Sequence, residues 1–167
     1  VIDKMGRHCV DSNQIFFEDM PVPVEHRIGE EGKGFRYLLT GLNAERILIA
    51  AGLVGLGRVA LRRATEYAQS RVVFGRPIGM NQAIQHPLAK NWAELEAANL
   101  LAFKAAAQHE AGEDCGVAAN AAKYLAAEAA FSACTNAVMT HGGMGYAKEY
   151  HVERYLREVM IHRIAPI

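Results

Sequence analysis

Residues 47–61 read ILIAAGLVGLGRVAL, and Arg58 is the one charged side chain in this run. A helix with this sequence is apolar on every side, which indicates that it is buried among other helices. The run is too short to cross a membrane, because a membrane-spanning helix needs about 18 continuous apolar residues. Gly52, Gly55 and Gly57 lower its helix propensity, so we expect them where another helix packs closely.

Around this run the sequence predicts four helices. The first covers about residues 35–70, and the second covers about 81–111, where apolar residues recur every three or four positions. The third covers about 116–141 and is rich in alanine, and the fourth covers about 148–164. Four helices joined by short connections predict an all-α fold, an up-and-down four-helix bundle.

Residues 1–32 differ in composition from the rest of the chain. Ile15, Phe16 and Phe17 form a short apolar run that suits a strand, and the prolines that follow favour extended chain. A polar, glycine-rich connector, residues 29–34, leads into the first helix. We therefore expect a short β segment before the bundle. Because the chain starts at Val1 and shows no signal peptide, we also expect it to be a fragment of a longer protein.

Composition excludes several classes of function. The 18 Lys and Arg residues balance the 18 Asp and Glu residues, which argues against a strongly cationic binder of nucleic acid or of a membrane surface. Apolar residues make up 51%, so the chain is not disordered. The three cysteines are far apart in sequence, which disfavours a disulfide framework or a cysteine-type zinc site and fits a reducing compartment.

Metal and dinucleotide motifs are also missing from the sequence. The seven histidines include no His-Glu-x-x-His pattern, so no metal site is predicted. Glu158 and His162 share a helix face, but that spacing suits a surface pair better than a pair of ligands. The three glycines of residues 52–57 do not follow a strand, so they indicate close helix packing rather than a dinucleotide fingerprint.

Three features could carry chemistry, and the residues alone leave a plainer interpretation open for each. The run of residues 141–145, HGGMG, could turn backbone N–H groups toward a ligand or could simply end a helix. Arg71 and Arg76 could bind phosphate or could be solvated loop residues. Glu45 enters an apolar stretch and should be partly desolvated, as a general base for a C–H proton requires, or it could pair elsewhere in the bundle.

Taken in order, these features resemble the C-terminal helical domain of the flavin-dependent acyl-CoA dehydrogenases, preceded by the end of their middle β domain. That resemblance implies a boundary between residues 1–32 and a bundle domain, 33–167, that is truncated at its end. The matching stretches span the chain: FEDMPVP (17–23), GEEGKGF (29–35), Glu45-Arg46 with AAG (50–52), YAQSRVVFG (67–75), QAIQ (82–85), HGGMGY (141–146) and RYLRE (154–158).

The resemblance implies the activity of a flavoenzyme. Such enzymes bind FAD, form homodimers or homotetramers, and oxidise acyl-CoA thioesters to trans-2-enoyl-CoA in fatty acid β-oxidation. A carboxylate removes the α proton, the β hydride passes to the flavin, and an electron-transfer flavoprotein receives the electrons. The resemblance places such a protein in the bacterial cytoplasm or the mitochondrial matrix, with the cytoplasm favoured, and without nucleic acid or membrane as a partner. The isolated fragment is expected to be inactive.

The resemblance also transfers roles to single residues. The residues that match cofactor-binding positions are Arg71, Phe74, Gln82, Met139, Thr140, His141, Gly142 and Gly143. The residues that match the acyl-CoA site are Asn43, Ala44, Glu45 and Arg46, with Asn43 standing where many members have Asp.

The catalytic base has two locations in the family. Most members place a Glu just after the fourth helix, and Pro166 occupies that position here. The isovaleryl-CoA and long-chain acyl-CoA dehydrogenases carry it on the first long helix, directly before an Arg, and Glu45-Arg46 matches that site. We therefore predict that Glu45 is the base. Two alternatives stay open: a flavoprotein of the same fold with other chemistry, such as nitroalkane oxidation, and a non-catalytic helical assembly module.

Overall fold

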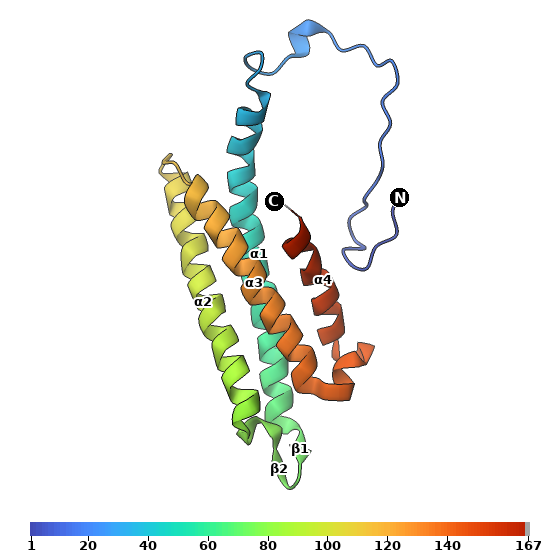
Figure 1. The fold of residues 1–167 in the computed structure, drawn as a ribbon, viewed down its shortest axis with the longest axis vertical. Coiled ribbons are helices and arrows are strands. Elements are labelled where there is room, and N and C mark those ends of the chain that lie inside the picture. The colour runs from blue at the N-terminus through green and yellow to red at the C-terminus, as the bar shows by residue number, and fades with distance from the viewer. Residues whose placement is uncertain (166–167) are drawn as a thin grey trace.

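The structure, a computed structural model, describes residues 1–165 and contains the expected four-helix bundle (Figure 1). Its helices are α1 (Gly34–Ser70), α2 (Gln82–Glu110), α3 (Gly116–His141) and α4 (Val152–Ile164). Three of them match the predicted ranges within about one residue. The fourth begins four residues later than expected, at Val152 rather than 148, because Lys148–Tyr150 form a separate 3-10 turn, η4.

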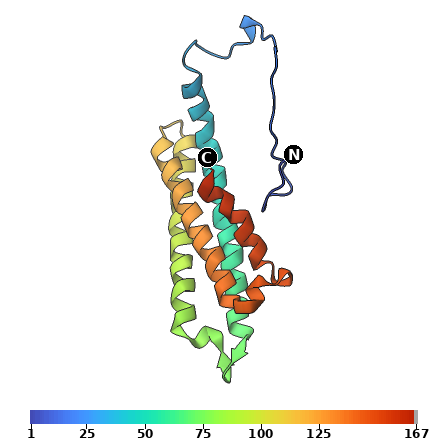
Figure 2. The same ribbon diagram turned by 45° about the vertical axis from the view of Figure 1, so that its right-hand side comes forward.

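Helix α3 lies in the middle of the bundle and packs against α1, α2 and α4 (Figures 1 and 2). Its interior face consists mainly of alanines that are wholly buried. Small side chains let the neighbouring helix axes approach closely, and Gly57 of α1 lies at such a point. A Cβ on Gly57 would come within 2.5 Å of Leu95 on α2 and 3.2 Å of the Cα of Ala130 on α3.

The expectation of close packing at all three glycines of α1 is wrong for two of them. A Cβ added at Gly52 or Gly55 would meet nothing within 4 Å, so these glycines face open space. The apolar run around them predicted burial on every side, but the bundle covers only one side of α1. Gly57 alone faces the helices that cross it.

A polar cluster is buried between α2 and α3. Asn91 is wholly buried, and its Nδ2 donates to Ser132 Oγ at 2.8 Å. Asn136 Nδ2 donates to Asn91 Oδ1 at 2.7 Å. Because a buried amide without partners is costly, these bonds favour one register of α2 against α3 over the others.

The strand expected at residues 15–17 is wrong. Residues 1–33 hold no strand; they contain the 3-10 turn η1 (Val24–His26), and the apolar side chains of Ile15, Phe16 and Phe17 are exposed. A strand needs a neighbour to pair its backbone groups, and none lies beside this segment within residues 1–165. The described sheet is a hairpin of β1 (Val72–Val73) and β2 (Arg76–Pro77), between α1 and α2.

The N-terminal segment arcs away from the start of α1 and returns beside α4 (Figures 1 and 2). Its contact with α4 is polar: the Arg7 backbone N–H donates to Glu158 Oε1 at 3.0 Å, and Arg157 donates to the Met5 carbonyl at 2.9 Å. Pro166, the residue at the usual base position, lies outside the described residues. Among the residues that the structure describes, no helix is long and apolar enough to cross a membrane.

Replacing Asn91 by alanine tests the buried polar cluster. We expect Asn91→Ala to lower the free energy of unfolding by about 2 kcal/mol, because Ser132 and Asn136 lose their shared partner inside the bundle. Urea denaturation followed by circular dichroism measures this. The matched control is Asn120→Ala, an exposed asparagine that bonds only to its own helix, which should change stability by about 0.5 kcal/mol or less. Equal losses of unfolding free energy in both variants would contradict a stabilising role for the buried polar cluster.

Candidate functional site

The turn after α3 requires glycine at two positions. Gly142 has φ 58° and ψ −134°, a backbone conformation that is essentially restricted to glycine. A Cβ at Gly145 would collide with the Val138 carbonyl, so only glycine lets the turn fold back against α3. The 3-10 turn η3 (Gly142–Tyr146) results, and it brings residues 140–144 up to the far end of α1.

A cavity of about 410 Å³ lies where this turn meets the end of α1. It joins two segments that are about seventy residues apart in sequence, Arg71 on one side and residues 140–143 on the other. Five of the eight predicted cofactor residues therefore line one cavity. The complete lining is Tyr67, Arg71, Val73, Ile78, Thr140, His141, Gly142, Gly143 and Met144.

The other three predicted cofactor residues lie outside this lining. Phe74 is at the tip of the hairpin, fully exposed, with φ 52°, followed by Gly75 with φ 80°. A bulky residue in the left-handed region is strained, so the hairpin holds an aromatic ring out from the surface at a cost of about 1 kcal/mol. Met139 is 72% exposed, and Gln82 is the exposed first residue of α2. All three are available to a neighbouring molecule.

His141 is held in one tautomer. Its ring stacks on Tyr67 at 4.2 Å between centroids and meets the edge of Tyr150 at 5.5 Å. Its Nδ1 lies 2.7 Å from the Ala137 carbonyl, so Nδ1 carries the proton and donates it. Burial lowers the pKa of His141, and Arg63 lowers it further, while the bond to Ala137 opposes them. The imidazole is therefore neutral near pH 7, with Nε2 as an acceptor.

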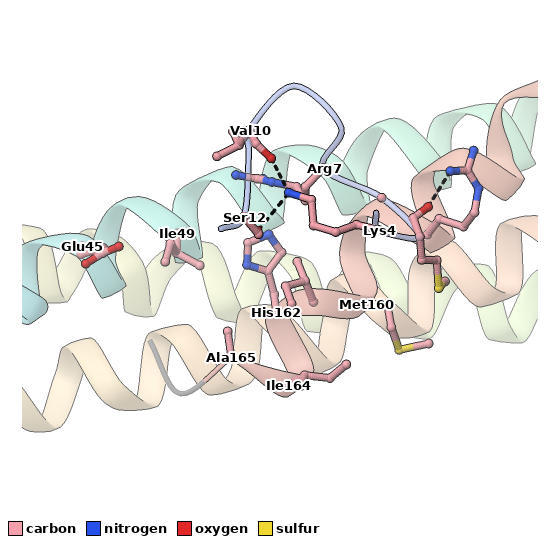
Figure 3. A pocket seen from close by; sticks show the side chains of 14 residues that line it. Lys4, Arg7, Val10, Ser12, Glu45, Ile49, Met160, His162, Ile164 and Ala165 are labelled. Carbon is pink, nitrogen blue, oxygen red and sulfur yellow. Dashed lines mark hydrogen bonds between the residues drawn. The ribbon is translucent and has the colours of Figure 1, made fainter. Parts of the chain in front are cut away.

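The predicted substrate residues 43–46 lie on the third turn of α1. Arg46 donates to Asn43 Oδ1 at 3.1 Å, so the two side chains order each other, and Ala44 is half-buried beside them. Glu45 lines two cavities between α1 and α4, of about 390 and 440 Å³, and Figure 3 shows the first. The expectation that Glu45 is partly desolvated is wrong for this chain, because its side chain is exposed. The run that follows it buries Ile47 and Ala50, which face away from Glu45.

Sequence reasoning missed two basic residues, His162 beside Glu45 and Lys123 near Arg46. His162 of α4 is half-buried and lines both of the cavities that contain Glu45, so it is not the surface residue that its spacing from Glu158 suggested. Lys123 of α3 donates through Nζ to the carbonyls of His162 at 2.9 Å and Ala165 at 2.7 Å. Burial lowers the pKa of Lys123, and Arg46 lowers it further. The sequence feature that could have indicated Lys123 is that it is the one lysine among the alanines of α3.

A metal centre does not account for any of these residues. Within residues 1–165 no three His, Cys, Asp or Glu side chains gather closely enough to hold an ion. The three cysteines are unpaired thiols, two of them buried. The predicted site residues lie at two places: Glu45 lines the cavities between α1 and α4, and Arg71 with the turn after α3 lines the cavity at the end of α1.

Known proteins match this chain over nearly its whole length. Residues 32–166 match the family model of the acyl-CoA dehydrogenase C-terminal domain. Acyl-CoA dehydrogenase fadE12 of Mycobacterium bovis is 44% identical over 156 residues, which cover 92% of this chain and 40% of that protein. The solved butyryl-CoA dehydrogenase of Megasphaera elsdenii superposes with a TM-score of 0.91 at 40% identity, over 98% of this chain and 43% of its own.

A chain in the solved electron transferring flavoprotein structure of Acidaminococcus fermentans matches equally well, with a TM-score of 0.91 at 38% identity over 98% of this chain and 43% of that one. This chain thus spans about two fifths of the length of the relatives that it matches.

The protonation of His141 makes stability depend on pH. Because its folded-state pKa lies below the ordinary value of about 6.5, the folded state disfavours the imidazolium. The contribution of neutral His141 to the free energy of unfolding is therefore complete above about pH 6.5, and it is lost as pH falls through the folded-state pKa. We expect the free energy of unfolding to fall on acidification, and less steeply in His141→Gln. Exposed His86→Gln is the control. An NMR titration that places the His141 pKa at or above 6.5 would contradict this.

Proposed function

The chain belongs to the acyl-CoA dehydrogenase family, and on that premise we propose that it supplies the C-terminal helical domain of a flavoenzyme that oxidises acyl-CoA thioesters to trans-2-enoyl-CoA. The observation that carries the proposal is the position of Glu45, a carboxylate that lines two cavities between α1 and α4. Asn43, Ala44 and Arg46 lie on the same turn, at the positions expected to meet the acyl-CoA.

Glu45 is proposed to accept the α proton. A thioester α carbon is weakly acidic, so the base must be an anion, and it becomes stronger when water is excluded from around it. In this chain the Glu45 side chain is exposed. Water would have to be excluded from it by the substrate and by parts of the relatives that this chain does not span. Hydrogen bonds to the thioester carbonyl would stabilise the enolate-like charge that develops as the proton leaves.

The described residues fit FAD as the cofactor. Arg71 forms no ion pair within residues 1–165, so its guanidinium is free to bind a phosphate group in the 410 Å³ cavity. The backbone of Gly142 and Gly143 lies without side chains at the same cavity, and neutral His141 offers an acceptor there. When bound, the flavin accepts the β hydride. The chain's own contribution is to bind and orient the group.

Partners follow from the same proposal. The hairpin holds Phe74 away from its own bundle. We therefore propose that Phe74, Arg71 and residues 139–143 bind one and the same FAD, which is held by a second subunit of a homodimer or homotetramer. An electron-transfer flavoprotein is the proposed electron acceptor.

Replacing Glu45 by glutamine tests the base. We expect Glu45→Gln, in the complete flavoprotein, to slow flavin reduction by acyl-CoA about 1000-fold, because the amide cannot accept the proton while size and polarity are kept. Anaerobic stopped-flow absorbance measures the rate, and a binding titration should show a Kd changed by roughly threefold or less, since charge contributes little to uniform binding. Glu66→Gln, an exposed carboxylate further along α1, is the control. Reduction at the wild-type rate would exclude Glu45 as the base.

The isolated chain should be inactive. We expect the 167-residue chain to hold no stoichiometric FAD and to transfer no hydride, because the cavities at Glu45 and at Arg71 are open and the chain spans about two fifths of its relatives. Gel filtration with flavin absorbance, followed by addition of acyl-CoA under argon, checks both points. A purified chain that retains one FAD and bleaches with acyl-CoA would show that this domain suffices.

A further inference from the structure

The cavity in Figure 3 contains a histidine that no predicted role uses. The His162 side chain projects from α4 toward the N-terminal segment, with Ile49 and Glu45 following along α1 beside it (Figure 3). Lys123 fixes the His162 backbone through its carbonyl at 2.9 Å. This bond holds the end of α4, which carries His162, against α3.

Most other polar groups of this cavity are already engaged. Lys4 Nζ donates to the Val10 carbonyl and, at 3.1 Å, to Ser12 Oγ. Arg157 donates to Glu153 at 2.8 Å and to the Met5 carbonyl. The His162 imidazole makes no hydrogen bond within residues 1–165. The rest of the lining is mainly apolar and includes Val10, Ile49, Met160, Ile161 and Ile164.

The imidazole can both donate and accept near neutral pH. Burial lowers the pKa of His162, and Arg7 of the N-terminal segment and Lys123 of α3 lower it further, whereas Glu158 of α4 raises it. Glu45 of α1 is the remaining charged group that lines both cavities with it. A neutral imidazole with one donor and one acceptor nitrogen complements a hydroxyl group, which has the same two capacities.

The cavity is lined by charges of both signs. Arg157 is paired with Glu153, whereas the Lys4 ammonium and the Arg7 guanidinium form no ion pair within residues 1–165. Glu45 adds a negative charge at the α1 side of the cavity. An acyl chain that ended in a carboxylate would pair with Lys4 or Arg7, so a preference for it would identify these cations, and not His162, as the specificity groups.

We infer that His162 is a specificity residue of the acyl site, which favours acyl-CoA thioesters whose chain carries an uncharged oxygen opposite the imidazole over plain hydrocarbon chains of the same length. The inference rests on the proposed function above. A hydrocarbon chain that covers the imidazole leaves a polar group unpaired, and a site with such a group discriminates against the analogue that cannot pair it. Because His162 is only half-buried, we expect roughly tenfold discrimination.

The test uses matched substrates with the complete flavoprotein. Plain acyl-CoA thioesters from four to eight carbons are compared with their ω-hydroxy and ω-carboxy counterparts by kcat/KM with an artificial electron acceptor. Three variants are compared with wild type: His162→Leu, which removes the polar group, His162→Gln, which keeps one, and His26→Leu, an exposed histidine in η1 that lines neither cavity.

At one chain length at least, we expect wild type and His26→Leu to favour the ω-hydroxy thioester roughly tenfold, mainly through KM, because His162 binds and does not transfer a proton. His162→Leu should favour the plain thioester, and His162→Gln should keep most of the wild-type preference. The inference about His162 is overturned if His162→Leu keeps the wild-type ratio of kcat/KM between the ω-hydroxy and the plain thioester, or if wild type prefers the ω-carboxy thioester. Either result leaves the proposed function standing. Failure of every thioester to reduce the flavin overturns the proposed function as well.

Discussion

The close approach that alanine permits on α3 is the constraint on which the rest of the structure depends. Twelve residues of α3 are buried, and nine of them are alanines, so three neighbouring helices can lie against its backbone. Each alanine buries little area, and the stability must therefore come from many small contacts with few voids. Gly57 and Leu95 show how tight this packing is, because a single Cβ on α1 has no room there.

The cavity at Arg71 and the cavities at Glu45 depend on where α3 places its ends. At its C-terminal end, Gly142 and Gly145 turn the chain back onto α3 and bring His141 under Tyr67 of α1. Nearer its N-terminal end, Lys123 reaches the last carbonyls of α4 and so sets where His162 faces α1. One alanine-rich helix therefore positions the cavity at Arg71 at one end and the cavities at Glu45 toward the other.

Local signals predicted the helices because each is bounded by residues that act locally. Gly116 and Gly142 delimit α3, and its predicted range is the observed one. The start of α4 was missed because His151 adopts φ 62°, a left-handed conformation that periodicity does not reveal. The strand at residues 15–17 was wrong because strand formation needs a pairing partner, and that partner is a property of the assembled fold.

The candidate site was predictable only where family motifs mark it. The resemblance assigned eight residues to the cofactor, and the structure brings five of them, Arg71 and residues 140–143, to one cavity. It gave no indication of Lys123 or His162, because their positions come from contacts between helices. The exposure of Glu45 was misjudged because a helix that is apolar along its sequence need not be covered on every side. Burial is decided by neighbours, and on this face of α1 the bundle supplies only α4.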